Sequence, residues 1–182
     1  MRSHKVTALG RLTPVRFRDF RVRARTRYTR QFMQKILHFD SPADQYQCDA
    51  AVLTCFDSRF DAALRKLLKR LGIERPDTIR IAGGTKAMAS PEPEFERDLI
   101  LDQIRKSIRL HRTTRALLVL HSDCGAYGGI AGRFGGSRDA EVACYEKEFQ
   151  NAAAALADSF PGIEVACYYI DFSGVWEVRP FR

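Results

Sequence analysis

The sequence predicts an α/β domain with a mainly parallel central sheet of about four strands flanked by helices. Short apolar runs alternate along the chain with longer segments in which apolar side chains recur at helical spacing. The runs are apolar throughout, as in strands buried on both faces, and strands that alternate with helices form parallel sheets with right-handed crossovers. The 182 residues are enough for one such domain with a sizeable core.

In the first third of the chain, two predicted helices flank the first strand. Apolar side chains at four-residue steps predict a helix over 26–38. The run Ala-Ala-Val-Leu-Thr-Cys predicts a strand at 50–55. Apolar spacing then predicts a helix from about 59 to 71, with Ser58 as its N-cap and Gly72 as its C-terminal stop.

Strands and helices continue to alternate in the rest of the chain. A helix with one apolar face opens at Ser90, and a longer helix covers about 142–160. The glycine-rich stretch 125–136 predicts a loop. Three further strands are expected at 78–82, 115–121 and 165–171.

Metal-binding side chains stand at the ends of two of these strands. Cys55 ends the first strand, while His121 and Cys124 end the strand at 115–121. Functional groups in open α/β sheets collect just past the carboxyl ends of strands, so these three side chains are expected to meet. A cysteine there can also be a packing residue, but both halves of the pattern fall at equivalent places. Two thiols and one imidazole provide three zinc ligands, which leaves the fourth position open as in catalytic sites.

Asp57 and Arg59 lie two and four residues beyond Cys55, at the turn from strand to helix. A carboxylate beside the metal can accept a hydrogen bond from hydroxide at the open position. Arg59 can grip that carboxylate in a bidentate pair and keep it off the metal. If Arg59 releases it, Asp57 could take the fourth position itself, so the sequence leaves open whether water or Asp57 is the fourth ligand.

Two cysteine chemistries compete with a metal site. A cysteine phosphatase loop is excluded, because it needs Cys-x₅-Arg and residue 61 is Asp. A Cys–His nucleophilic pair stays open. With zinc, two thiolates and a neutral imidazole would give an uncharged centre at which hydroxide is accessible, since the metal lowers the pKa of bound water.

The net charge of +8 is unevenly distributed along the chain. Residues 1–30 hold ten Lys or Arg against Asp19, a net of +9, so residues 31–182 sum to −1. We therefore expect a basic N-terminal arm at 1–25 and a single zinc-binding domain at 26–182. The arm could be a poorly ordered extension, a segment that wraps a partner subunit, or an Arg-rich targeting sequence. Nucleic-acid binding is not expected, because no aromatic platform or known motif accompanies the charges.

The five cysteines do not have the spacing of a secreted disulfide framework. Cys144 and Cys167 are expected to pack in the core, and the role of Cys48 stays open. No apolar run has the length of a membrane span, so no membrane association is expected. A reducing compartment fits best, which favours the cytoplasm, although organelle targeting by the basic arm stays open.

These motifs resemble those of the β-class carbonic anhydrases. The family signature is Cys-x-Asp-x-Arg followed by His-x-x-Cys, and it is matched by Cys55, Asp57, Arg59, His121 and Cys124. Residues 80–84 and 168–174 resemble two further family segments, so the likeness covers roughly 45–175 and is closest to a short, divergent branch.

The resemblance implies one Zn²⁺ per chain on the Cys-His-Cys set, with an Asp–Arg dyad beside it. It also implies reversible hydration of CO₂ to bicarbonate, a lyase activity, in a homodimer or larger assembly. Relatives that hydrolyse COS or CS₂ use the same ligands, so these substrates stay open. A non-catalytic zinc-bearing protein that binds an acidic partner is a further alternative.

The substrate pocket departs from the family pattern. Ile81 and Gly84 replace two Asn residues, and neither Gln45 nor Gln47 aligns with the family's pocket glutamine. Candidate wall residues near the motifs are Phe56, Gly83, Gly84 and Tyr127. In the family, N-terminal helices pack across the dimer. The N-terminal segment of this chain carries an apolar stripe that must be buried somewhere, formed by Tyr28, Phe32, Met33, Ile36 and Leu37.

Overall fold

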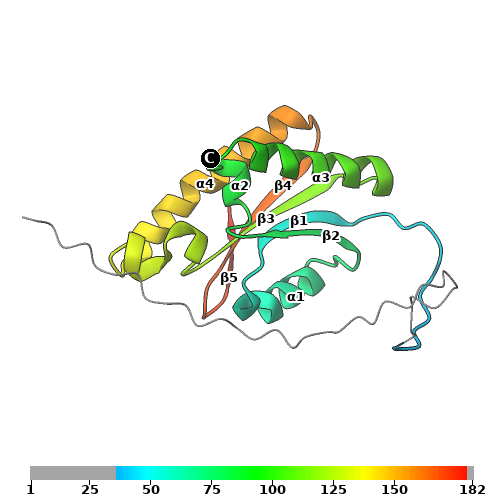
Figure 1. The fold of residues 1–182 in the computed structure, drawn as a ribbon, viewed down its shortest axis with the longest axis horizontal. Helices are drawn as coiled ribbons and strands as arrows, with labels where there is room; N and C mark the ends of the chain where they lie inside the picture. The colour runs from blue at the N-terminus through cyan, green and yellow to red at the C-terminus, as the bar shows by residue number, and fades with distance from the viewer. Residues whose placement is uncertain (1–35, 180–182) are drawn as a thin grey trace, which may run out of the picture. The chain divides into compact units, whose positions relative to one another are not determined.

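A five-stranded sheet organises the chain from Ala43 onward in the computed structural model, which describes residues 36–179 (Figure 1). The strand order is β2-β1-β3-β4-β5. The first four strands are parallel, and β5 runs antiparallel to β4. The strands are β1 (Ala50–Cys55), β2 (Pro76–Ile81), β3 (Arg115–His121), β4 (Glu164–Ile170) and β5 (Val175–Val178). The α/β class with a mostly parallel sheet is confirmed.

Helices cover both faces of the sheet, which explains why β1 and β3 are apolar without alternation. The helix α1 (Asp61–Arg70) lies on one face, where Leu64 and Leu68 pack in a cluster with Val52 of β1. The opposite face is covered by α2 (Lys86–Ala89), α3 (Phe95–His111) and α4 (Arg138–Ser159). All six residues of β1 are buried.

The strands at 50–55 and 115–121 have the boundaries that the sequence predicts. The four-residue elements β5 and α2 are additions to the prediction, because so short a run carries no readable periodicity. The helix expected from Ser90 begins five residues later, after two prolines. The predicted loop at 125–136 contains two short helical turns, η2 (Gly125–Tyr127) and η3 (Gly129–Arg133).

The N-cap expected at Ser58 is wrong. A 3₁₀ turn, η1 (Ser58–Phe60), precedes α1, and the Asp57 side chain caps that turn by accepting a hydrogen bond from the Arg59 amide. The stop at Gly72 is confirmed, with a φ of +68° that favours glycine.

The N-terminal predictions fall largely outside the described residues. The basic arm at 1–25 and most of the helix expected at 26–38 lie there, and the described residues 36–38 are not helical. No helix within 36–179 is both long and apolar enough to cross a bilayer.

Asp77 ties three segments together near the amino ends of the strands. Its carboxylate accepts hydrogen bonds from Tyr46 Oη at 2.8 Å, Ser107 Oγ at 2.6 Å and His111 Nδ1 at 2.8 Å. Cys48, whose role the sequence leaves open, is buried, and its sulfur accepts a hydrogen bond from the Asp77 amide. The carboxylate therefore links the segment before β1, the start of β2 and the end of α3.

We expect Asp77→Ala to lower the free energy of unfolding by about 2–3 kcal/mol at neutral pH, since about three net hydrogen bonds are lost. Burial would raise the pKa of Asp77, but the bonds from Ser107, His111 and Tyr46 outweigh it and lower the pKa. A depressed pKa stabilises the fold above the unfolded pKa of about 3.9 and loses that effect as the pH falls through the folded value.

Urea unfolding of the wild type and of Asp77→Ala across this pH range checks the prediction. The difference between them should be largest at neutral pH and should shrink in acid. Asp102→Ala is the control, because its carboxylate is 43% exposed in a pair with Lys106 on α3. A difference that grows on acidification would contradict the assignment.

Candidate metal centre

Three side chains of the types that bind metal ions meet at the carboxyl ends of β1 and β3. These strands are parallel neighbours, as the sequence predicts, so their ends lie side by side. Cys55 is the last residue of β1, His121 is the last residue of β3, and Cys124 follows in the next turn. All three side chains are buried, and their ligand atoms lie within 4.8 Å of one another.

His121 presents one ring nitrogen to this cluster. Its Nδ1 lies 2.8 Å from the Ser122 carbonyl oxygen, which can only accept, so Nδ1 carries the proton. Nε2 is then a lone-pair donor, and it is buried with no hydrogen-bond partner among residues 36–179. Buried polar atoms are rarely left unpartnered. The ring is therefore set up as a ligand, with Phe60 packed against it at a centroid distance of 4.7 Å.

The two thiols differ in acidity. A hydrogen bond from the Cys124 thiol outweighs burial and lowers the pKa of Cys55. The same contact with Cys55, together with burial, raises the pKa of Cys124. A thiolate is the form that binds metals, and a divalent cation between the two sulfurs would favour it at both positions.

Asp57 and Arg59 form the bidentate pair that the sequence predicts. Arg59 Nε lies 3.1 and 3.0 Å from the two carboxylate oxygens of Asp57, and Arg59 Nη2 lies 2.6 Å from Oδ2. These bonds hold the pKa of Asp57 below its usual range. Oδ2 stands 4.0 Å from His121 Nε2. The carboxylate thus sits beside the cluster with both of its oxygens held by Arg59.

Asp123 is a second acidic partner of Arg59 that the sequence analysis missed. Arg59 Nη1 donates to Asp123 Oδ2 and Nη2 donates to the Asp123 carbonyl, each at 3.0 Å. Asp123 has a φ of +56°, which is unusual for a residue other than glycine. The feature of the sequence that could have pointed to Asp123 is its position between His121 and Cys124, inside the His-x-x-Cys motif.

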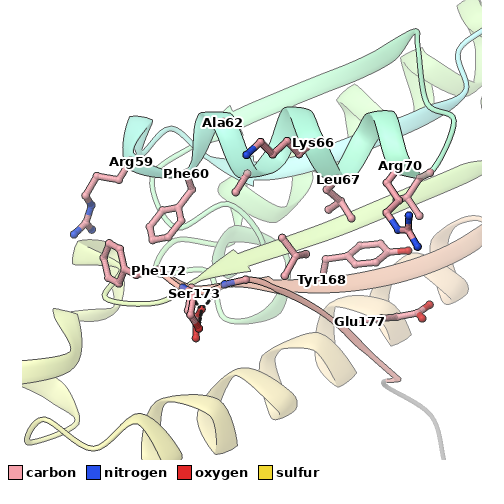
Figure 2. A pocket seen from close by; sticks show the side chains of 15 residues that line it. Arg59, Phe60, Ala62, Lys66, Leu67, Arg70, Tyr168, Phe172, Ser173 and Glu177 are labelled. Atoms are coloured by element: carbon pink, nitrogen blue, oxygen red, sulfur yellow. Dashed lines mark hydrogen bonds between the residues drawn. The ribbon is translucent and has the colours of Figure 1, made fainter.

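Figure 2 shows Arg59 beside a groove of about 670 Å³ on the α1 side of the sheet. The guanidinium carbon lies 5.6 Å from the centre of the Phe60 ring and 5.5 Å from that of Phe172. Lys66 and Arg70 of α1 and Glu177 of β5 also line the groove. Arg59 is therefore fixed both by its carboxylates and by two aromatic faces.

A separate cavity of about 800 Å³ opens over the metal-ligand cluster. Of the predicted wall residues, Phe56 and Gly83 line it, whereas Gly84 and Tyr127 do not. Tyr127 is buried and donates to Glu148 at 2.7 Å. Gly84 lies against the end of β1, where a Cβ would come within 2.6 Å of the Cys55 nitrogen.

Residues 45–181 match the protein family described as "Putative carbonic anhydrase". The chain belongs to this family. The resemblance stated from the sequence motifs is thereby confirmed. Uncharacterized proteins of Rickettsia conorii and Rickettsia bellii are 24% identical to it over 133 residues, which cover 72% of this chain and 72% and 81% of theirs.

Solved β-carbonic anhydrases share the fold of this family member. The carbonic anhydrase of Streptococcus mutans superposes with a TM-score of 0.51 at 20% identity, covering 74% of this chain and 84% of that one. The enzyme CafA of Aspergillus fumigatus gives 0.52 at 16% identity, with coverages of 75% and 78%. Tetrameric β-carbonic anhydrases of Sordaria macrospora give 0.52 at 14%, with coverages of 74% and 81%. The Cys-His-Cys cluster resembles a β-carbonic anhydrase zinc site.

Proposed function

We propose that this protein is a zinc-dependent carbonic anhydrase that hydrates CO₂ reversibly to bicarbonate. The observation that carries the proposal is the buried Cys55, His121 and Cys124 cluster, in which His121 Nε2 has no hydrogen-bond partner among the described residues. Family membership and the position of Asp57 beside the cluster support it.

The residues of the cluster fit Zn²⁺. Two thiolates and one imidazole nitrogen are ligands that zinc prefers, and three protein ligands leave one position for a small molecule. Cys55, His121 and Cys124 would hold one ion per chain, which would supply Lewis acidity that makes a water molecule a nucleophile at neutral pH.

Asp57 and Arg59 would orient that nucleophile. The Asp57 carboxylate can accept the nucleophile's O–H hydrogen, which directs an oxygen lone pair toward the carbon of CO₂. Arg59 donates to both Asp57 oxygens and so keeps the carboxylate from replacing the nucleophile. A C–O bond forms, one C=O bond becomes C–O⁻, and the proton lost from water passes to solvent.

Phe56 and the small residues around it would form the CO₂ site. Phe56 and Gly83 line the cavity over the cluster, and neither offers a charged side chain. This apolar part of the wall suits an uncharged gas, and the charged lining residues Asp57, Arg59 and Asp123 are paired with one another.

The first prediction is that purified protein carries about one zinc ion per chain and that Cys124→Ser loses most of it. A serine hydroxyl stays protonated at neutral pH and is a poor replacement for a thiolate. Elemental analysis measures the content. Cys144→Ser is the control, because that partly buried thiol lies on α4 outside the cluster. Absence of zinc from the wild type, even after refolding with zinc, would refute the metal site.

The second prediction is that Asp57→Ala lowers the rate of CO₂ hydration by about 100-fold or more while zinc stays bound. Asp61→Ala should keep the wild-type rate, since that carboxylate pairs with Arg80 and does not line the cavity. A stopped-flow assay with a pH indicator measures both variants.

The same assay separates the alternatives. Turnover of COS or CS₂ without turnover of CO₂ would keep the site and replace the substrate. A zinc-loaded wild type that turns over none of the three gases would indicate a zinc-bearing binding protein.

We also propose a homodimer or larger assembly in which the N-terminal segment packs on a partner subunit. Apolar side chains are exposed in the described part of that segment: Ile36 is 86%, Leu37 is 76% and Phe39 is 76% accessible. Phe56 at the cavity and Phe172 beside Arg59 are also more than half exposed. Exposed apolar groups of this size mark interaction sites. Tetrameric assembly of the Sordaria macrospora neighbours supports the proposal.

Two deletions distinguish a dispensable arm from a subunit contact. Removal of residues 1–25 should leave the oligomer, the zinc and the activity intact. Removal of 1–39 should dissociate the oligomer and reduce activity, because the exposed apolar segment is lost. Light scattering gives the mass of each form, and a fully active monomer after the longer deletion would contradict the proposal.

A further inference from the structure

Glu141 on α4 is a fully buried carboxylate behind the metal-ligand cluster. Its Oε2 accepts from Ser122 Oγ at 2.7 Å and from Tyr169 Oη at 2.9 Å. Its Oε1 accepts from the Asp123 amide at 2.7 Å and from Tyr145 Oη at 3.5 Å. Glutamate is rarely buried unless its oxygens are satisfied, and two of these four donors belong to the turn between His121 and Cys124.

One peptide group connects Glu141 to His121. The carbonyl of Ser122 accepts the His121 Nδ1 proton, and the amide of Asp123, in the same peptide unit, donates to Glu141. A peptide unit is planar and rigid, so fixing its N–H end also fixes its carbonyl end. The Ser122 hydroxyl also donates a hydrogen bond to the Glu141 carboxylate, so the carboxylate contacts both the side chain and the peptide group of Ser122.

We infer that Glu141 is a positioning residue that orients His121 and strengthens it as a zinc ligand through this peptide; the inference rests on the proposed zinc site. A charged acceptor on the N–H polarises the peptide, so its carbonyl becomes a better acceptor for the imidazole proton. Zinc-bound histidines usually give their second N–H to a carboxylate or carbonyl, which raises ligand basicity. Here the Ser122 carbonyl accepts the histidine proton, and the Glu141 carboxylate acts on that carbonyl through the peptide group.

The same carboxylate steadies Arg59. Asp123 holds a φ of +56°, a sparsely populated conformation that persists only where neighbours impose it. Three contacts do so: its amide donates to Glu141, its Oδ1 accepts from the Ile130 amide at 3.1 Å, and its Oδ2 accepts from Arg59. Glu141 therefore supports both the proposed ligand and the residue that anchors the dyad arginine.

Glu148 supplies a matched comparison on the same helix, seven residues further along. It is also buried, and it accepts from Ser90 Oγ at 2.6 Å and from Tyr127 Oη at 2.7 Å. Neither of these two partners lies between His121 and Cys124. Loss of either carboxylate should weaken the fold, but only loss of Glu141 should change the metal centre.

The test compares Glu141→Gln with Glu148→Gln in full-length protein. A glutamine oxygen can still accept the Asp123 amide, and the hydroxyls can rotate to accept its NH₂, so the first variant removes charge with little change of shape. Competition with a chelator gives zinc affinity, the absorption of the Co²⁺-substituted protein reports ligand geometry, and thermal unfolding reports stability.

We expect Glu141→Gln to bind zinc about 10-fold or more weakly and to shift the Co²⁺ bands. Glu148→Gln should match the wild type in both readouts even where its unfolding temperature falls. If Glu141→Gln does not fold, Ser122→Ala takes its place, because it removes one of the two contacts between Glu141 and Ser122 while keeping the Ser122 carbonyl. Wild-type zinc affinity together with wild-type Co²⁺ bands in the folded variant overturns the inference.

The readouts keep this inference separate from the proposed function. A wild type that binds zinc without hydrating CO₂ overturns the function alone, and weakened zinc binding in Glu141→Gln then still supports the positioning role. A wild type that hydrates CO₂, with Glu141→Gln unchanged in zinc affinity and Co²⁺ bands, overturns the positioning role alone.

Discussion

Parallel pairing of β1 with β3 is the constraint on which the rest of the centre depends. The two strands hydrogen-bond only over Ala51–Leu53 and Ala116–Leu118, yet this register brings their carboxyl ends together. Cys55 stands at the carboxyl end of β1 and His121 at the carboxyl end of β3, although 66 positions separate them in the sequence. Helices on both faces keep these strands dry, so the cluster forms at the edge of a rigid, close-packed layer.

Polar contacts around the cluster form two layers. In front, Arg59 joins Asp57 to Asp123, and thereby joins the turn after β1 to the turn after β3. Behind, the Glu141 carboxylate satisfies donors of the turn after β3 from within the core. Burial of a carboxylate is costly unless both of its oxygens accept hydrogen bonds. The hydroxyls of Tyr145 and Tyr169 provide the remaining hydrogen bonds to Glu141. The front layer is partly exposed, so water competes with it more than with the back layer.

The sequence predicts β1, β3 and the meeting of Cys55, His121 and Cys124 because each of these features is encoded locally. The apolar runs of β1 and β3 are continuous, and Cys55 and His121 stand at their ends. The contacts of Asp123 and Glu141 could not be predicted, because they join residues that are far apart in the sequence. The Asp123–Arg59 pair joins the turns after β3 and β1, and the contacts of Glu141 depend on how α4 packs on the sheet. Glu141 also precedes the apolar positions that define its helix, where a charged residue normally faces water. Likewise, the cap role of Asp57 competes locally with Ser58, and only the geometry of the 3₁₀ turn decides it.

Glycine or alanine occupies several of the positions that line the cavity over the cluster: Ala82, Gly83, Gly125, Ala126, Gly128 and Gly129. Not all of these can vary. A Cβ at Gly83 would approach Lys86 and Ala126 to about 3 Å on a backbone with positive φ. Gly125 has neither restriction, because nothing lies within 4 Å of its Cβ position. The volume available to a small molecule can therefore drift during evolution through position 125 without repacking the sheet, while position 83 stays fixed by its own backbone.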